Sequence, residues 1–134
     1  MDSSVKDLSS YRINRAEEML QSAESTLNND DIRTSLNRSY YAIFHAMRAL
    51  NALDGFDSSK HSGVIAHFNQ FFVKTGKIDS RFSNVVKDAS YLREKADYDD
   101  FYIVSRKEAI DQLESAKGFL EEVKAYIGSI EQGS

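Results

Sequence analysis

The segment IRTSLNRSYYAIFHAMRALNAL, residues 32–53, carries the strongest helical pattern in this chain. Its apolar residues recur every three or four positions, which predicts a long amphipathic helix. The inner stripe of this helix consists of Ile32, Leu36, Ile43, Met47 and Leu50. The far side holds Thr34, Tyr41, Ala42, Ala49 and Ala52. A surface helix normally carries Lys and Glu there, so we expect a second body to cover this side, such as a second copy of the chain in a symmetric dimer.

Four further segments with helical period lie on either side of this one. They are expected at about residues 10–28, 60–72, 80–96 and from 105 onward. In the turn between the first two helices, Asp30 or Asp31 can cap the second helix, and Ser105 with Glu108 forms a capping box. Short loops between long amphipathic helices predict an all-α fold, an antiparallel four- to five-helix up-and-down bundle. The residues expected to meet in one core are Leu20, Leu36, Ile43, Leu50, Phe68, Leu92, Leu113 and Leu120.

The bulk composition narrows the class of protein. A chain of 134 residues is predicted to be a single domain, 1–134, with a core at about 10–128 and short flexible termini. The absence of Cys excludes disulfides, zinc fingers and thiol nucleophiles. A net charge of −4 argues against a general nucleic-acid coat protein. The N-terminus lacks a signal-peptide pattern and the apolar runs are too short to span a bilayer, so we expect a cytoplasmic protein with no membrane contact.

Arg38 and His45 are the main candidates for chemistry. They lie seven residues apart, almost two helical turns, and therefore project from the same face. His45 can take a proton from a ribose 2′-hydroxyl or give one to a leaving 5′-oxygen, while Arg38 can hold the scissile phosphate. This reaction needs no metal or cofactor. Asn37 and Ser39 can position a phosphate oxygen or the imidazole.

Other polar residues leave alternatives open. Further substrate contacts are predicted at Tyr41, Arg93 and Tyr98. Arg93 and Tyr98 can line the edge of an RNA groove, and Arg93 alternatively fits a solvated helix end. His61 and His67 lie six residues apart and do not share a helix face, so they are not expected to form a metal pair. His61 is either a local structural contact or part of a site. The carboxylates of Asp97, Asp99 and Asp100 fit either a solvated loop or a Mg²⁺ site.

Three segments together resemble a known family. The stretch Asn37–Ala46 resembles the signature helix of HEPN-domain proteins, in which an Arg is followed after four to six residues by a His. Lys60–Val64 and Leu92–Tyr98 resemble the small standalone members, and the resemblance as a whole covers roughly residues 12–126, nearly the whole chain. It implies a helical bundle that dimerises through the motif helix, with Arg38 and His45 at the catalytic positions. It also implies a metal-independent endoribonuclease toxin that pairs with a minimal nucleotidyltransferase as its antitoxin.

Two function classes therefore compete. The intact pair of Arg38 and His45 favours a ribonuclease-type toxin acting on RNA. The rival is a non-catalytic module that binds a nucleotide or a partner nucleotidyltransferase. The sequence pI of about 5.4 favours this rival. So does Ser39, which stands where many family nucleases carry Asn, Asp or His. Met47 likewise stands where some toxins carry a Tyr that the partner modifies. A purely structural dimerising bundle would leave the Arg/His pair unexplained.

Overall fold

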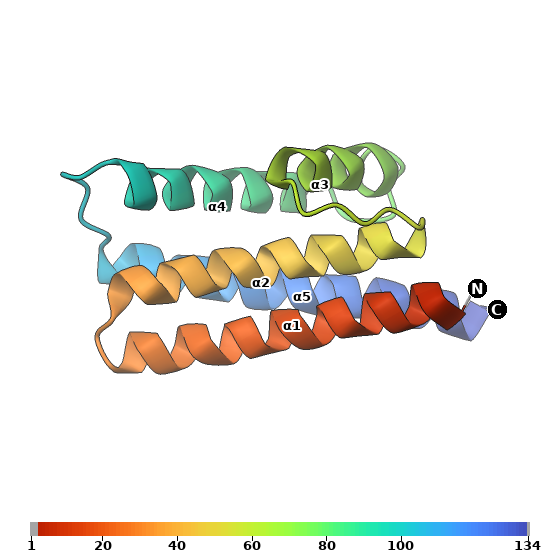
Figure 1. Cartoon of the computed structure of the whole chain (residues 1–134), viewed down its shortest axis with the longest axis horizontal. Coiled ribbons are helices and arrows are strands. Elements are labelled where there is room, and N and C mark those ends of the chain that lie inside the picture. The colour runs from red at the N-terminus through yellow and green to blue at the C-terminus, as the bar shows by residue number, and fades with distance from the viewer. Residues whose placement is uncertain (1–2, 134) are drawn as a thin grey trace.

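The computed structural model describes residues 3–133, and the regular structure of these residues is entirely helical. Its elements are α1 (Ser3–Asn28), α2 (Ile32–Leu53), α3 (His61–Phe68), the π-helical turn η1 (Asn69–Val73), α4 (Arg81–Tyr98) and α5 (Arg106–Gly133). Figure 1 shows α3 and α4 on one side of α2, α1 on the opposite side and α5 behind. The predicted all-α bundle is confirmed, and α2 has the predicted bounds.

The central helix α2 contacts each of the other four α-helices. The turn before it reverses the chain at Asp30, which adopts a left-handed conformation with φ of 61°, one that Asp tolerates better than most residues. The predicted side-chain cap is wrong, because Asp31 makes no capping hydrogen bond and the Asp30 carboxylate pairs with Arg106 of α5. The turn thereby ties the start of α2 to the start of α5.

The helix ends agree with the predicted ones at some positions and differ from them at others. The predicted capping box of α5 is confirmed: the Glu108 carboxylate accepts from the Ser105 N–H at 3.0 Å, and the Ser105 hydroxyl accepts from the Glu108 N–H at 3.0 Å. By contrast, α1 begins at Ser3, well before the expected Ser10. The third helix passes into the π-helical turn η1, where the Lys74 N–H donates to the Asn69 carbonyl at 2.9 Å.

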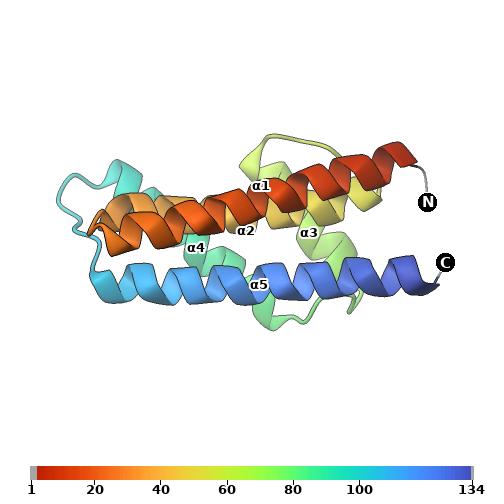
Figure 2. The same cartoon turned by 90° about the horizontal axis from the view of Figure 1, so that it is seen from below.

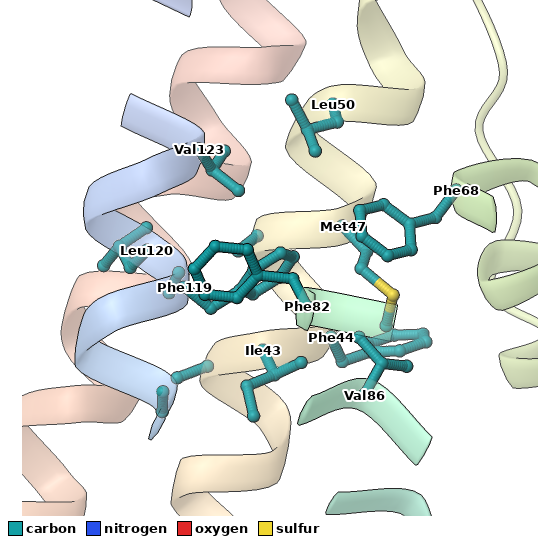
Figure 3. Packing of buried hydrophobic residues seen from close by; sticks show 14 of the residues in the cluster. Ile43, Phe44, Met47, Leu50, Phe68, Phe82, Val86, Phe119, Leu120 and Val123 are labelled. Carbon is teal, nitrogen blue, oxygen red and sulfur yellow. The ribbon is translucent and has the colours of Figure 1, made fainter. Parts of the chain in front are cut away.

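A large hydrophobic core fills the space between the helices. Phe119 of α5 lies at its centre and meets Phe68 and Phe82, each with ring centroids 5.5 Å away (Figure 3). The expectation of a single core is wrong, because Leu36 and Leu92 belong to a second, smaller cluster. That cluster joins the start of α2 to the end of α4 and to the segment before α5.

The alanines on the far side of α2 are buried inside one chain. Ala42, Ala49 and Ala52 are at most 1 % exposed. Helix α1 packs along α2, and the Ser9 hydroxyl donates to the Ala49 carbonyl at 2.9 Å. The inference that these alanines need a second copy of the chain is therefore wrong, since α1 is the body that covers them.

Candidate functional site

A strip of partly exposed polar residues remains on α2 between α1 and the α3–α4 side. Arg38, Tyr41, His45 and Arg48 follow one another at steps of three and four residues, so they share one helix face. The Arg38 Nη1 donates to Asn37 Oδ1 at 2.8 Å. At a rise of 1.5 Å per residue, Arg38 and His45 are offset by about 10 Å along the axis. We call this set the α2 strip.

The His45 imidazole lies among arginines from two helices. Its Nδ1 is buried without a hydrogen-bond partner. Burial first, and then the charges of Arg15, Arg12 and Arg48, lower the pKa of His45 from 6.5 to about 4. The ring is therefore neutral at physiological pH and can accept a proton, and Nε2 is the nitrogen left for a ligand.

Two of these arginines share one carboxylate oxygen. The Oδ1 of Asp57 accepts from Arg48 Nη2 at 2.7 Å and lies 3.5 Å from Arg12 Nη2. The hydrogen bond from Arg48 is the main reason why the pKa of Asp57 is lowered. Arg12 stands on α1, Arg48 on α2 and Asp57 in the segment between α2 and α3. Three separate parts of the chain therefore meet at Asp57, and Arg48 lies three residues after His45 on α2.

Arg12, Arg15 and Arg48 were not predicted as site residues from the sequence. Arg48 has a sequence signal, because it continues the spacing of Arg38, Tyr41 and His45 by three residues. Arg12 and Arg15 have none, because their approach to His45 depends on how α1 packs against α2.

A second polar network lies on the α3–α4 side of α2. The Tyr40 hydroxyl lies 2.6 Å from His61 Nδ1, and Arg93 Nη1 lies 2.9 Å from the same nitrogen. Arg only donates hydrogen bonds, so Nδ1 is the acceptor and the neutral ring carries its proton on Nε2. Burial and then Arg93 lower the pKa of His61. Ser90 and His61 border a cavity of about 240 Å³ at this network.

Aromatic rings connect this network to the α2 strip. Phe44 stacks on His61 with ring centroids 4.4 Å apart and meets the His45 ring edge-on at 5.9 Å. The Tyr41 ring also lies 6.0 Å from the His61 ring. His61 thus contacts both Tyr41 and Phe44 of the motif helix.

The structure separates the other predicted contacts. Arg93 lies in the His61 network, whereas Tyr98 is 77 % exposed at the end of α4. Ser39 is fully buried and its hydroxyl has no hydrogen-bond partner. A ligand on the α2 strip therefore does not reach Ser39, and the expectation that it contacts substrate is wrong. His67 pairs with Asp54 at 2.9 Å, far along the chain from the motif.

Neither a metal cluster nor a membrane span is found in residues 3–133. These residues hold no group of three or more His, Cys, Asp or Glu side chains able to bind a metal ion. Within the same range, every helix is too short or too polar to cross a bilayer.

Helical bundle, Arg/His motif and supporting segments together define the class of protein. The chain belongs to the HEPN domain family, whose model matches residues 9–126. It is 34 % identical over 122 residues to a Thermotoga maritima protein named "UPF0332 protein", covering 91 % of this chain and 92 % of that protein. Two Methanocaldococcus jannaschii proteins, named "Putative toxin MJ0142" and "Putative toxin MJ0605", are 30 % and 33 % identical, each over 86 % of this chain and over 78 % and 85 % of their own lengths. The family match and these names support a HEPN toxin-like role.

Proposed function

We propose that this protein is a metal-independent endoribonuclease of the toxin–antitoxin type. The observation that carries the proposal is the neutral His45, which stands on the α2 strip with cationic side chains around it. A neutral imidazole is the form that accepts a proton, and arginine is suited to hold a phosphate. The toxin names of two relatives agree with this function.

The proposed reaction uses two residues of the strip. His45 removes the proton from a ribose 2′-hydroxyl, and the 2′-oxygen attacks the adjacent phosphorus. The bond from phosphorus to the 5′-oxygen breaks, and the protonated His45 returns its proton to that oxygen as it leaves. The products are a 2′,3′-cyclic phosphate and a 5′-hydroxyl. Arg38 binds the non-bridging oxygens and stabilises the charge that develops on them.

The site is proposed to form between two copies of the chain. Arg38 and His45 are offset by about 10 Å along α2. If a two-fold axis brings the α2 strips of two copies together with the helices antiparallel, Arg38 of one copy would lie near His45 of the other. Tyr41, which lies between them on the strip, is partly exposed and could take part in such a contact. By the family resemblance, a minimal nucleotidyltransferase is the proposed antitoxin.

The test uses the purified protein with a mixed RNA pool. His45→Ala and Arg38→Ala should each abolish cleavage, and loss of proton transfer alone is worth about 10²–10⁴-fold. Cleavage should persist in EDTA, end in a cyclic phosphate and stop when the 2′-hydroxyl at the cut is replaced by hydrogen. His67→Ala is the matched control and should cleave like the native protein. Equal cleavage by native and His45→Ala proteins would remove His45 from the site.

The burial of Ser39 favours a second function, that of a non-catalytic binding module. Ser39, next to Arg38, is buried and cannot assist a reaction on the strip. The same arginines would also hold the phosphate of a nucleotide without cleaving it. If native protein leaves many different RNAs intact, a non-catalytic module that binds a nucleotide or a nucleotidyltransferase becomes the better account.

A further inference from the structure

The Asp57 carboxylate rests in a place built by two arginines. The side chains of Arg12 and Arg48 are only 14 % and 13 % exposed, whereas that of Asp57 is 45 % exposed. The arginines stand on α1 and α2, and Arg48 also packs over the Phe44 ring at 5.8 Å. Asp57 instead stands in the connection between α2 and α3. The cationic side is thus fixed by packed helices, and the anion comes from a connecting segment.

This region carries more positive than negative charge. The charges of three arginines of α1 and α2, namely Arg12, Arg15 and Arg48, act on the pKa of His45. Among residues 3–133, their ion pairs are made with two carboxylates, those of Asp57 and of Glu18, which pairs with Arg15 at 2.9 Å. The Nε atoms of Arg12 and Arg48 are also buried without hydrogen-bond partners. Because these two guanidinium groups share a single carboxylate oxygen, they can bind an anion that offers more than one oxygen.

The shape of the contact matches a phosphate. The Oδ1 atom of Asp57 forms ion pairs with two guanidinium groups, those of Arg12 and Arg48. A non-bridging phosphate oxygen can be bound by two arginines in the same way. A phosphodiester has a second such oxygen, which the remaining N–H donors can bind. Arg48 stands one turn beyond His45 on the side away from Arg38, so this position adjoins the proposed reaction centre.

We propose that Arg12 and Arg48 bind a backbone phosphate of RNA beside His45, and that Asp57 occupies this phosphate position in the free chain and is displaced by RNA. The proposal rests on the proposed function and adds to it a second phosphate contact and a competing carboxylate. RNA binding must then break the Asp57 pairs, which lowers the affinity of the free protein.

Binding of an uncleavable 2′-O-methyl oligoribonucleotide tests this, because it is independent of catalysis. Asp57→Asn removes the competing charge and should bind the oligonucleotide several-fold more tightly by fluorescence anisotropy. Asp30→Asn is the matched control, since Asp30 pairs with Arg106 at the turn between α1 and α2; it should bind like the native protein. Arg48→Gln should bind more weakly and lower the slope of log affinity against log salt by about one, whereas Arg106→Gln should not.

A second measurement guards against misfolded variants. Inorganic phosphate added to the native protein should shift the Nε–H signals of Arg12 and Arg48 in nuclear magnetic resonance spectra, and leave that of Arg106 unchanged. Equal binding by Asp57→Asn and Asp30→Asn, or phosphate shifts absent from Arg12 and Arg48, would overturn the proposal, and His45-dependent cleavage would be unaffected by that result. Tighter binding by Asp57→Asn in a protein that cleaves no RNA would uphold the phosphate position and reject the ribonuclease function.

Discussion

The imidazole of His45 is kept neutral by two different causes. Burial is the larger, because a charged ring would lose hydration, and the charges of Arg15, Arg12 and Arg48 add to it. Binding of a phosphate beside these arginines would offset part of their charge. The proton affinity of His45 is therefore tied to the occupancy of the neighbouring anion position.

The titration of His45 can be followed by nuclear magnetic resonance of the ring. We expect a pKa of about 4 in the native protein. Arg48→Gln should raise the pKa by removing one of the causes, but not to 6.5, because burial remains. Arg106→Gln is the control and should leave the pKa unchanged. A native His45 that titrates near 6.5 would contradict the described environment.

The same shift predicts a pH dependence of stability. The folded pKa of His45 lies below its ordinary value of 6.5, so the unfolded chain binds the proton more tightly. The free energy of unfolding should therefore be largest above pH 6.5 and fall as the pH decreases from 6.5 toward about 4. His45→Ala should flatten this part of the profile in denaturant titrations.

Different sides of helix α2 contact different neighbours. The alanine side lies against α1, the stripe with Ile43 and Leu50 lies in the main core, and the α2 strip stays partly open. Small side chains at Ala42 and Ala49 allow α1 to approach closely. This division explains why one helix can carry both packing residues and the motif.

Ala49→Glu separates the two accounts of the alanine side. If α1 covers Ala49, the substitution forces a carboxylate into a packed interior and should lower the free energy of unfolding by several kcal/mol. The effect should be the same at every protein concentration, because the contact lies within one chain. Ala125→Glu, at an exposed position of α5, is the control. A stable Ala49→Glu protein that is merely monomeric would restore the dimer account of this face.

Local signals predicted the elements well and their neighbours poorly. The bounds of α2 and the Ser105–Glu108 box depend on residues close in sequence, and both were predictable. A helical wheel shows that the side with Ala49 must be covered, but not whether α1 or another chain covers it. Ser9 lies in the part of α1 before the expected start, and its contact with Ala49 joins residues 40 apart, which no local signal reveals.

For the candidate site, too, residues within one helix were predictable and residues brought in by tertiary packing were not. Arg38 and His45 come from spacing within one helix, so the sequence places them on one face. Arg12 and Asp57 lie on other segments, and only the packing of α1 and of the α2–α3 connection brings them to Arg48. The burial of Ser39 could have been predicted, because Ser39 lies three residues after Leu36 and four before Ile43 and therefore on the inner stripe of the helix.

At the scale of the whole molecule, the proposed site requires two chains. The chain mass is 15.2 kDa, and light scattering should give twice this value for the native protein. Co-refolded Arg38→Ala and His45→Ala chains should recover about a quarter of native cleavage, because half of the dimers are mixed and each mixed dimer holds one intact site of two. Each variant alone should remain inactive. No recovery on mixing would place both residues in a site within one chain.

Both ends of the helical chain lie at one end of the bundle. Figure 2 shows α1 beginning and α5 ending there, with the two helices antiparallel. A short peptide could therefore join these ends, and a new opening between Asp99 and Ile103 would leave the Ser105 cap intact. The gene would then encode α5 first and α4 last while each helix kept its neighbours. In this bundle the order of segments in the gene is separable from their order in space.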